Sequence, residues 1–81
     1  MTFMKLYVIV DKLAEESGPV FEAANDKVAR RQYKKMMQDV DETEYQLLRV
    51  GRIDHYIQKC VGEDPVDVTK EKLVELQEDE E

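Results

Sequence analysis

Four segments of the chain have the short runs of apolar residues, rich in β-branched and aromatic types, that are typical of β-strands. These segments are residues 5–11, 20–23, 45–53 and 56–61. In the first segment, Leu6 and Val8 face one way and Tyr7 and Ile9 the other, so we expect a central strand with apolar residues on both faces. In the third segment, Gly51 marks the place where we expect a β-bulge.

Glycine, proline and acidic residues predict where these strands end. Gly18 and Pro19 predict a turn before the second segment, because Gly tolerates a positive φ and Pro fixes its own φ. A further turn is expected near Asp54 and His55. Pro65 and its acidic neighbours are expected to break the pattern after the last strand.

Residues 26–40 have the clearest helical pattern, because Asn25 or Asp26 offers an N-cap and no Gly or Pro follows. Apolar residues share one side of this helix: Ala29, Tyr33, Met36, Met37 and Val40. Basic residues share the other side: Lys27, Arg30, Arg31, Lys34 and Lys35. Thr69 predicts the cap of a short second helix that ends near Gln77, where the acidic end of the chain is expected to fray.

The order of these elements predicts an α+β fold. A small, largely antiparallel β-sheet packs against one amphipathic helix, and the short C-terminal helix is the weakest part of the pattern. The 81 residues suffice for a single domain, which we assign to residues 1–77, followed by an acidic flexible tail at residues 78–81. Because so short a chain buries only about 60% of its unfolded surface, we expect an edge strand or a shared apolar patch to support a homodimer.

Charge and cysteine usage narrow the class of protein. The net charge of −7 excludes a uniformly basic nucleic-acid coat protein. The single cysteine, Cys60, cannot form an intramolecular disulfide, which favours a reducing, cytoplasmic setting. The longest apolar run, residues 6–10, is too short for a signal-peptide core or a membrane span, so we expect neither export nor a membrane partner.

Catalytic and metal chemistry find little support. Cys60 and His55 offer a nucleophile and a base, but we favour the ordinary interpretation of a histidine in a turn and a small apolar cysteine in a strand. Asp54, His55 and Cys60 lack the second Cys or His pair of a zinc site. The three glycines are scattered and form no phosphate-binding loop. We therefore expect no enzyme, no metal and no cofactor.

The charges are divided along the chain. Residues 25–40 hold five basic and two acidic residues, whereas residues 41–81 hold five basic and 13 acidic residues. The basic helix face Lys27, Arg30, Arg31, Lys34 and Lys35 suits the phosphates of single-stranded DNA, with exposed Tyr available for stacking on bases. The alternative is that this face is simply the solvated side of a surface helix.

The acidic second half also has more than one interpretation. It keeps the protein soluble, folds back on the basic helix in competition with nucleic acid, or docks on a basic replication, capsid or host protein. The last of these is the alternative function that we carry forward, an acidic protein–protein interaction module.

Several short motifs occur in a characteristic order over residues 4–54. They are Met4-Lys5-Leu6-Tyr7 with Asp11, Gly18-Pro19 with Phe21, Asp26 with Ala29-Arg30, and Tyr45, Leu47 and Val50-Gly51 with Asp54. In this order the chain resembles the small non-structural protein family of gokushoviruses, the single-stranded DNA phages of the Microviridae. The usual proline-rich turn keeps only Pro19, and the acidic region after Asp54 does not match the family pattern.

Members of that family are described as DNA-binding or replication-associated, and they are likened to protein C of the phiX-type phages, which helps switch viral synthesis from duplex to packaged single strands. The resemblance implies a non-enzymatic accessory protein of viral single-stranded DNA replication or packaging in the cytoplasm of the bacterial host. Its implied partners are single-stranded DNA and a phage or host replication protein.

Overall fold

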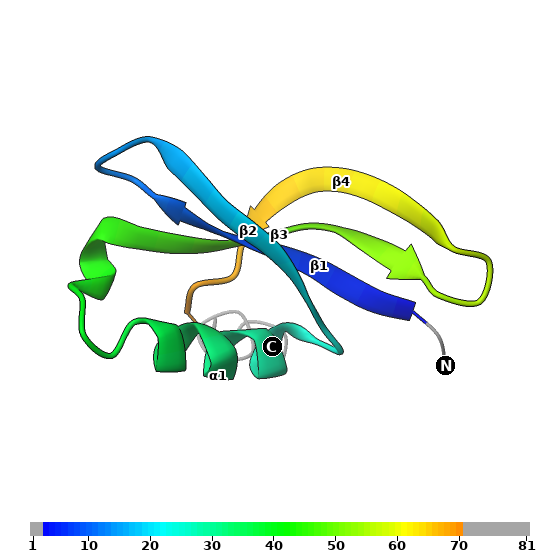
Figure 1. Ribbon diagram of the computed structural model, residues 1–81, viewed down its shortest axis with the longest axis horizontal. Coiled ribbons are helices and arrows are strands. Elements are labelled where there is room, and N and C mark those ends of the chain that lie inside the picture. Colours follow the sequence, from blue (N-terminus) through cyan, green and yellow to red (C-terminus); the bar gives the residue numbers. More distant parts are fainter. Residues whose placement is uncertain (1–2, 71–81) are drawn as a thin grey trace, which may run out of the picture.

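A computed structural model describes residues 3–70, apart from the side chain of Glu42. The elements follow one another as β1 (Phe3–Asp11), β2 (Glu16–Ala23), α1 (Asp26–Met36), the short 3-10 helix η1 (Glu42–Glu44), β3 (Tyr45–Asp54) and β4 (Lys59–Asp67). The strands form one sheet, and α1 lies across one of its faces (Figure 1). The predicted α+β architecture, a sheet with one helix, is therefore confirmed.

The sheet has the strand order β2-β1-β3-β4, and each neighbouring pair is antiparallel. β1 lies in the interior of the sheet, as its two apolar faces predicted. Tyr7 of β1 stands opposite Phe21 of β2, and their rings stack with centroids 5.8 Å apart. Such cross-strand aromatic pairs add to the stability of the sheet beyond the area that they bury.

Two hairpins connect β1 to β2 and β3 to β4, and both use a four-residue turn of the same design. Asp11 pairs with Glu16 in the first hairpin, and Asp54 pairs with Lys59 in the second. In each turn the aspartate Oδ1 accepts a backbone N–H from the residue two positions later, and the last turn residue has a positive φ, 59° at Glu15 and 58° at Gln58. Asp side chains commonly close turns in this way.

The predicted turn at Gly18 and Pro19 is wrong. Both residues lie within β2, as a bulge opposite Ile9 of β1, because the register passes from Val8–Val20 to Val10–Ser17. β2 is an edge strand, where a proline costs no ladder hydrogen bond on its outer side.

The predicted break at Pro65 is also wrong, for the same reason. β4 is the other edge strand and continues through Pro65 to Asp67, with residues 63–65 opposite the single residue Val50. The strand predicted at residues 56–61 also begins later than expected, at Lys59, because residues 55–58 form the turn.

Helix α1 ends earlier than the pattern predicted. It stops at Met36 instead of Val40, and the cap residue Met37 donates its N–H to the carbonyls of Tyr33 and Lys34. Residues 37–39 then turn the chain toward η1 and β3. Of the second predicted helix, Thr69 and Lys70 form a bend, and the remainder lies outside the described residues together with the predicted tail.

The hydrophobic core lies between α1 and the sheet. The largest fully buried side chains are Tyr7, Tyr33 and Leu47, and Ala29 of α1 and the cap residue Met37 join them in the core. Met36 and Val40, which the helical pattern placed on the apolar side, are exposed, because the helix turns Met36 to its outer flank and ends before Val40. Four-residue spacing from Ala29 to Met37 thus defines the buried stripe.

The face of the sheet that turns away from α1 is also apolar. Side chains alternate along a strand, so Leu6, Val8 and Val10 point opposite to Tyr7 and Ile9, which join the core beneath α1. Val8 is buried, and its two neighbours on this open face are half-buried.

Gly51 is buried where β3 passes between β1 and β4. It pairs with Leu6 on one side and with Gly62 on the other, and the register of the β1–β3 pair shifts at Val50, one residue before the predicted bulge at Gly51. A Cβ on Gly51 would lie only 2.3 Å from the backbone carbonyl oxygen of Val61. The two strands can approach this closely only while residue 51 has no side chain.

Gly51→Ala is expected to lower the free energy of unfolding by about 1–3 kcal/mol, because the backbone of β4 must move to admit the methyl group. Gly62→Ala is the matched control, since a Cβ there meets nothing within 4 Å. Urea denaturation of the two variants measures the difference. Equal stability of the two variants would contradict the close packing of β3 on β4.

Candidate functional site

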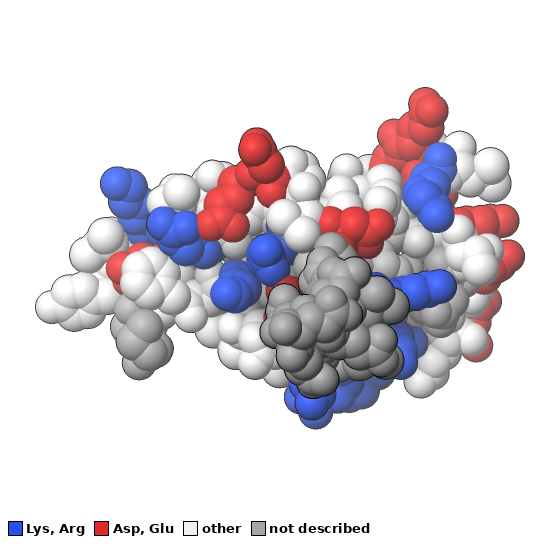
Figure 2. All heavy atoms as spheres, turned by 180° about the vertical axis from the view of Figure 1, so that it is seen from behind, with Lys and Arg blue, Asp and Glu red and all other residues white. Residues whose placement is uncertain are grey.

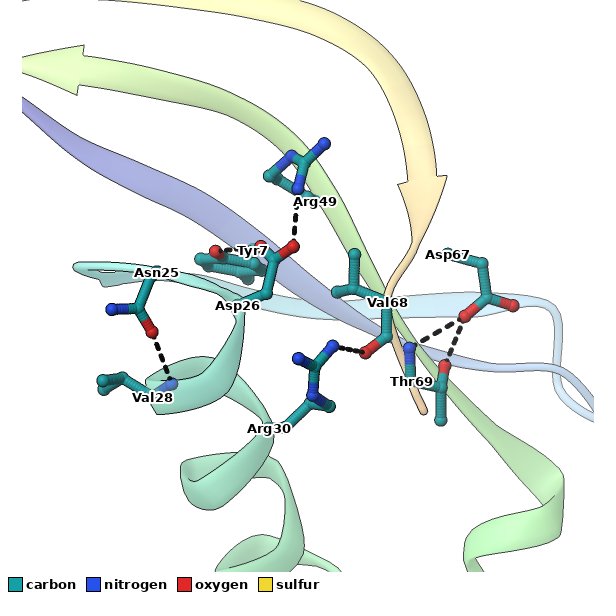
Figure 3. Close-up of polar contacts among 9 residues, drawn as sticks. All are labelled: Tyr7, Asn25, Asp26, Val28, Arg30, Arg49, Asp67, Val68 and Thr69. Atoms are coloured by element: carbon teal, nitrogen blue, oxygen red, sulfur yellow. Dashed lines mark hydrogen bonds and ion pairs between the residues drawn. The ribbon is translucent and has the colours of Figure 1, made fainter. Parts of the chain in front are cut away.

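The first turn of α1 is attached to the sheet through Asp26. Asn25 caps the helix, and its side-chain oxygen accepts the N–H of Val28 at 3.0 Å. The two carboxylate oxygens of Asp26 bind different strands: Oδ1 accepts the hydroxyl of Tyr7 at 2.6 Å, and Oδ2 accepts Nη1 of Arg49 at 2.7 Å (Figure 3). One carboxylate thus fixes α1 to both β1 and β3.

This arrangement shifts the ionisation of both acids in it. Burial alone raises the pKa of Asp26, but the hydrogen bonds from Tyr7 and Arg49, with the charge of Arg49, outweigh it and hold the pKa below its ordinary value. Burial raises the pKa of Tyr7, and the bond to the Asp26 carboxylate raises it further. Asp26 is therefore a charged acceptor and Tyr7 a neutral donor at neutral pH.

The chain that follows β4 is held beneath the middle of α1. Val68 donates its N–H to the carbonyl of Leu47 at 2.9 Å, and the Thr69 hydroxyl accepts the N–H of Leu47 at 2.8 Å. Asp67 in turn accepts the Thr69 hydroxyl at 2.6 Å. From the helix side, Arg30 Nη1 donates to the carbonyl of Val68 at 3.1 Å (Figure 3).

These contacts leave a groove of about 650 Å³ between one flank of α1 and residues 69–70. We call it the basic groove, because five of its lining residues are cationic: Lys27, Arg30, Arg31, Lys34 and Lys70. None of the described residues that line it is acidic. Figure 2 shows Lys and Arg atoms along the lower edge of the molecule, over α1, whereas many Asp and Glu atoms lie along the upper edge.

The structure brings four of the five predicted basic residues to this groove. Lys27, Arg31 and Lys34 are exposed, whereas Arg30 is half-buried and bound to the Val68 carbonyl, so it also positions the far wall. Lys35 is exposed on α1 but does not line the groove. The fifth cation of the groove is Lys70, which the sequence analysis did not predict. It lies far from α1 in the sequence, and no local pattern connects its segment to the helix.

A second hollow, of about 630 Å³, lies at the end of the sheet that faces the N-terminus of α1. Its cations are Lys5, Arg49 and Arg52. Arg49 is paired with Asp26, and Arg52 with Glu63 at 2.6 Å, so these two arginines are already partly neutralised. Ala24 lines this hollow and the next residue, Asn25, lines the basic groove.

The remaining candidate chemistry is dispersed. His55 lies in the β3–β4 turn, where Nε2 is 2.8 Å from Glu22 Oε1, and Cys60 is exposed on β4. Within residues 3–70, no group of three His, Cys, Asp or Glu side chains is arranged to hold a metal ion. In the same part of the chain, no helix is long and apolar enough to cross a membrane.

Tyr7→Phe is expected to destabilise the protein by about 1.5 kcal/mol, at the lower end for a hydrogen bond to a charged group, because the Asp26 side chain is 29% exposed. Tyr56→Phe, which removes the same hydroxyl from an exposed ring, is expected to change stability by less than about 0.5 kcal/mol. Thermal denaturation compares the two, and equal midpoints would contradict the role of Tyr7.

The lowered pKa of Asp26 also predicts a pH dependence. Because the folded pKa lies below the unfolded value of about 3.9, this contribution to stability is complete above that value and is lost as pH falls through the folded pKa. Asp26→Asn is expected to be less stable than wild type at pH 7 and to approach it as the pH falls below the unfolded pKa of about 3.9. Urea denaturation across this range tests the convergence, and a constant difference would contradict it.

The chain matches one protein-family model, described as Phage ORF5 protein, over residues 4–74. The match extends well beyond residue 54, where the resemblance found in the sequence ended, and it includes every residue of the basic groove. No curated protein and no solved structure matches the chain. Because the match covers most of the chain, the protein belongs to the Phage ORF5 protein family, a family of phage proteins.

Proposed function

We propose that this protein is a non-enzymatic phage accessory protein that binds single-stranded DNA through the basic groove during viral DNA replication or packaging. The observation that carries the proposal is the groove itself, which gathers five cations and no described carboxylate in a chain of net charge −7. Phosphates along a nucleic-acid strand are the natural complement of such a row.

The geometry of α1 supports a short contact with a strand. Residues 27 to 34 extend over about 10 Å of the helix axis at ~1.5 Å per residue, which accommodates two or three successive phosphates. Phosphates in the groove can be attracted even though the whole protein is acidic. Salt screens the acidic residues that lie farther from the phosphates than a Debye length of about 8–10 Å. The groove therefore acts locally, against the charge of the whole chain.

Membership of a phage protein family supports the viral setting, in the cytoplasm of the bacterial host. The narrower assignment to gokushoviruses of the Microviridae, with a role like that of protein C of the phiX-type phages, is part of the same proposal. It rests on the resemblance of residues 4–54. A phage or host replication protein is the partner that would deliver or receive the strand.

A second candidate function is an acidic interaction module that docks on a basic replication, capsid or host protein. It is favoured by the exposed acids Glu63 and Asp64 on edge strand β4 and by the apolar face of the sheet opposite α1. That open face is also where we place the expected homodimer, because prolines at irregularities in β2 and β4 disfavour pairing through either edge.

Fluorescence anisotropy of a labelled single-stranded oligonucleotide, titrated at several salt concentrations, tests the proposal. The logarithm of the binding constant is expected to fall with the logarithm of salt concentration. A slope between about −1.4 and −3.5 corresponds to two to five neutralised phosphates at ~0.7 each. Arg31→Gln with Lys34→Gln is expected to weaken binding about tenfold at low salt and to reduce the slope by up to about 1.4.

Lys12→Gln with Lys35→Gln is the matched control, since it removes the same charge from exposed residues outside the groove. Its affinity and slope should stay close to those of wild type. Arg30 is left intact because it also holds the Val68 carbonyl. Equal losses in both double variants would point to a diffuse effect of net charge, and absence of binding by wild type at low salt would favour the interaction module.

A further inference from the structure

The β3–β4 hairpin presents two large apolar side chains at its tip. Tyr56 is 82% exposed and Ile57 is 58% exposed. Two adjacent exposed apolar side chains form a small surface that is available for contact, and the Tyr ring can stack on a flat ligand. Neither residue belongs to the core cluster beneath α1, so the packing of the described chain does not account for them.

The turn that carries Tyr56 is held in one conformation by several bonds. Asp54 Oδ1 accepts the N–H of Tyr56 at 2.9 Å, and Gln58 Nε2 donates to the carbonyl of His55 at 2.7 Å. The contact between His55 and Glu22 joins the turn to β2, across β1. A tip fixed in this way loses little conformational freedom when a ligand binds.

Further aromatic and cationic groups surround the base of the hairpin. Phe3, which pairs with Asp54, is 47% exposed, and the guanidinium of Arg52 lies 6.0 Å from its ring centroid. Lys59 is exposed at the start of β4. Phe3 and Arg52 both line the second hollow. In Figure 1 the β3–β4 turn lies at the right-hand end of the molecule, and the N-terminal end of α1 is the end of the helix that lies nearer to it.

We propose that the tip of the β3–β4 hairpin stacks on unpaired bases of single-stranded DNA, with the ring of Tyr56 as the platform and Ile57 beside it. This inference rests on the proposed function and extends it: the basic groove holds phosphates, and the hairpin holds bases of the same strand. Every base has a π face, so stacking accepts any sequence, and only an unpaired strand exposes those faces.

The surroundings favour a nucleic-acid strand over a protein partner at this tip. Lys59 lies at the base of the hairpin, and the second hollow is lined by three cations, Lys5, Arg49 and Arg52, and by one acid, Glu63. Cations of this kind can pair with the phosphates of a nucleic-acid strand. The other hairpin provides the contrast. It has the same turn geometry but presents Leu13, which is 78% exposed, without an aromatic ring.

Tryptophan at position 56 gives a direct measurement, because the natural chain contains none. Titration of Tyr56→Trp with single-stranded oligo(dT) is expected to quench the indole fluorescence, and an abasic oligonucleotide of the same length is expected to leave it nearly unchanged. Leu13→Trp, on the matched turn, should show no quenching with either. Equal quenching at both positions, or none at position 56 while anisotropy reports binding, overturns the inference.

Affinity gives the second measurement. Tyr56→Ala is expected to weaken oligo(dT) binding about 5- to 100-fold without changing the salt slope, whereas Tyr56→Phe retains the ring and the affinity. An unchanged affinity for Tyr56→Ala, with the groove double variant still impaired, overturns the hairpin contact alone and leaves the tip for a protein partner. Absence of oligo(dT) binding by wild type overturns the hairpin contact and the proposed function together.

Discussion

The position of helix α1 depends on a single carboxylate. Asp26 accepts the Tyr7 hydroxyl from β1 and the Arg49 guanidinium from β3, so the first turn of the helix cannot rotate without breaking a charged hydrogen bond. Apolar packing of Ala29 and Tyr33 would by itself allow some rotation, because dispersion and hydrophobic burial have little direction. The hydrogen bonds of the Asp26 carboxylate are directional and therefore fix the rotation of α1 about its axis. They thereby decide which flank of α1 faces the chain after β4 and which side chains enter the basic groove.

The placement of charged side chains explains how a chain with a net negative charge presents a basic groove. Several carboxylates are used locally: Asp11 and Asp54 accept backbone N–H groups in the turns, and Asp67 accepts from Thr69. None of these three acids lines the groove, although Asp67 is bonded to Thr69, which does. The cations of α1, in contrast, are spaced so that four of them reach one flank. Net charge therefore describes this protein poorly, and the distribution of charge over its surface decides what it attracts.

Local patterns predicted the parts of the fold that depend on neighbouring residues. The apolar runs of β1 and β3 and the cap at Asn25 were sufficient to predict those strands and the start of α1. The turn predicted at Pro19 and the strand break predicted at Pro65 were wrong. A proline costs a strand little at the edge of a sheet, and the position of a strand in the sheet cannot be deduced from its neighbouring residues. The helical pattern predicted the four groove cations that α1 carries. It could not predict Lys70, because the segment that carries it is placed by the tertiary contacts of Val68 with Leu47 and Arg30.

In both hairpins, the residues that form the turn differ from the residues that are exposed at its tip. Each turn is specified by an aspartate and by a residue with positive φ, and neither turn needs its exposed tip residues for the core. Leu13 and Tyr56 are therefore positions where the side chain can change while the backbone stays the same. The proposed phosphate pairing in the groove and the proposed stacking at the tip share one property: neither would depend on base identity, because every nucleotide has a phosphate and every base has a π face.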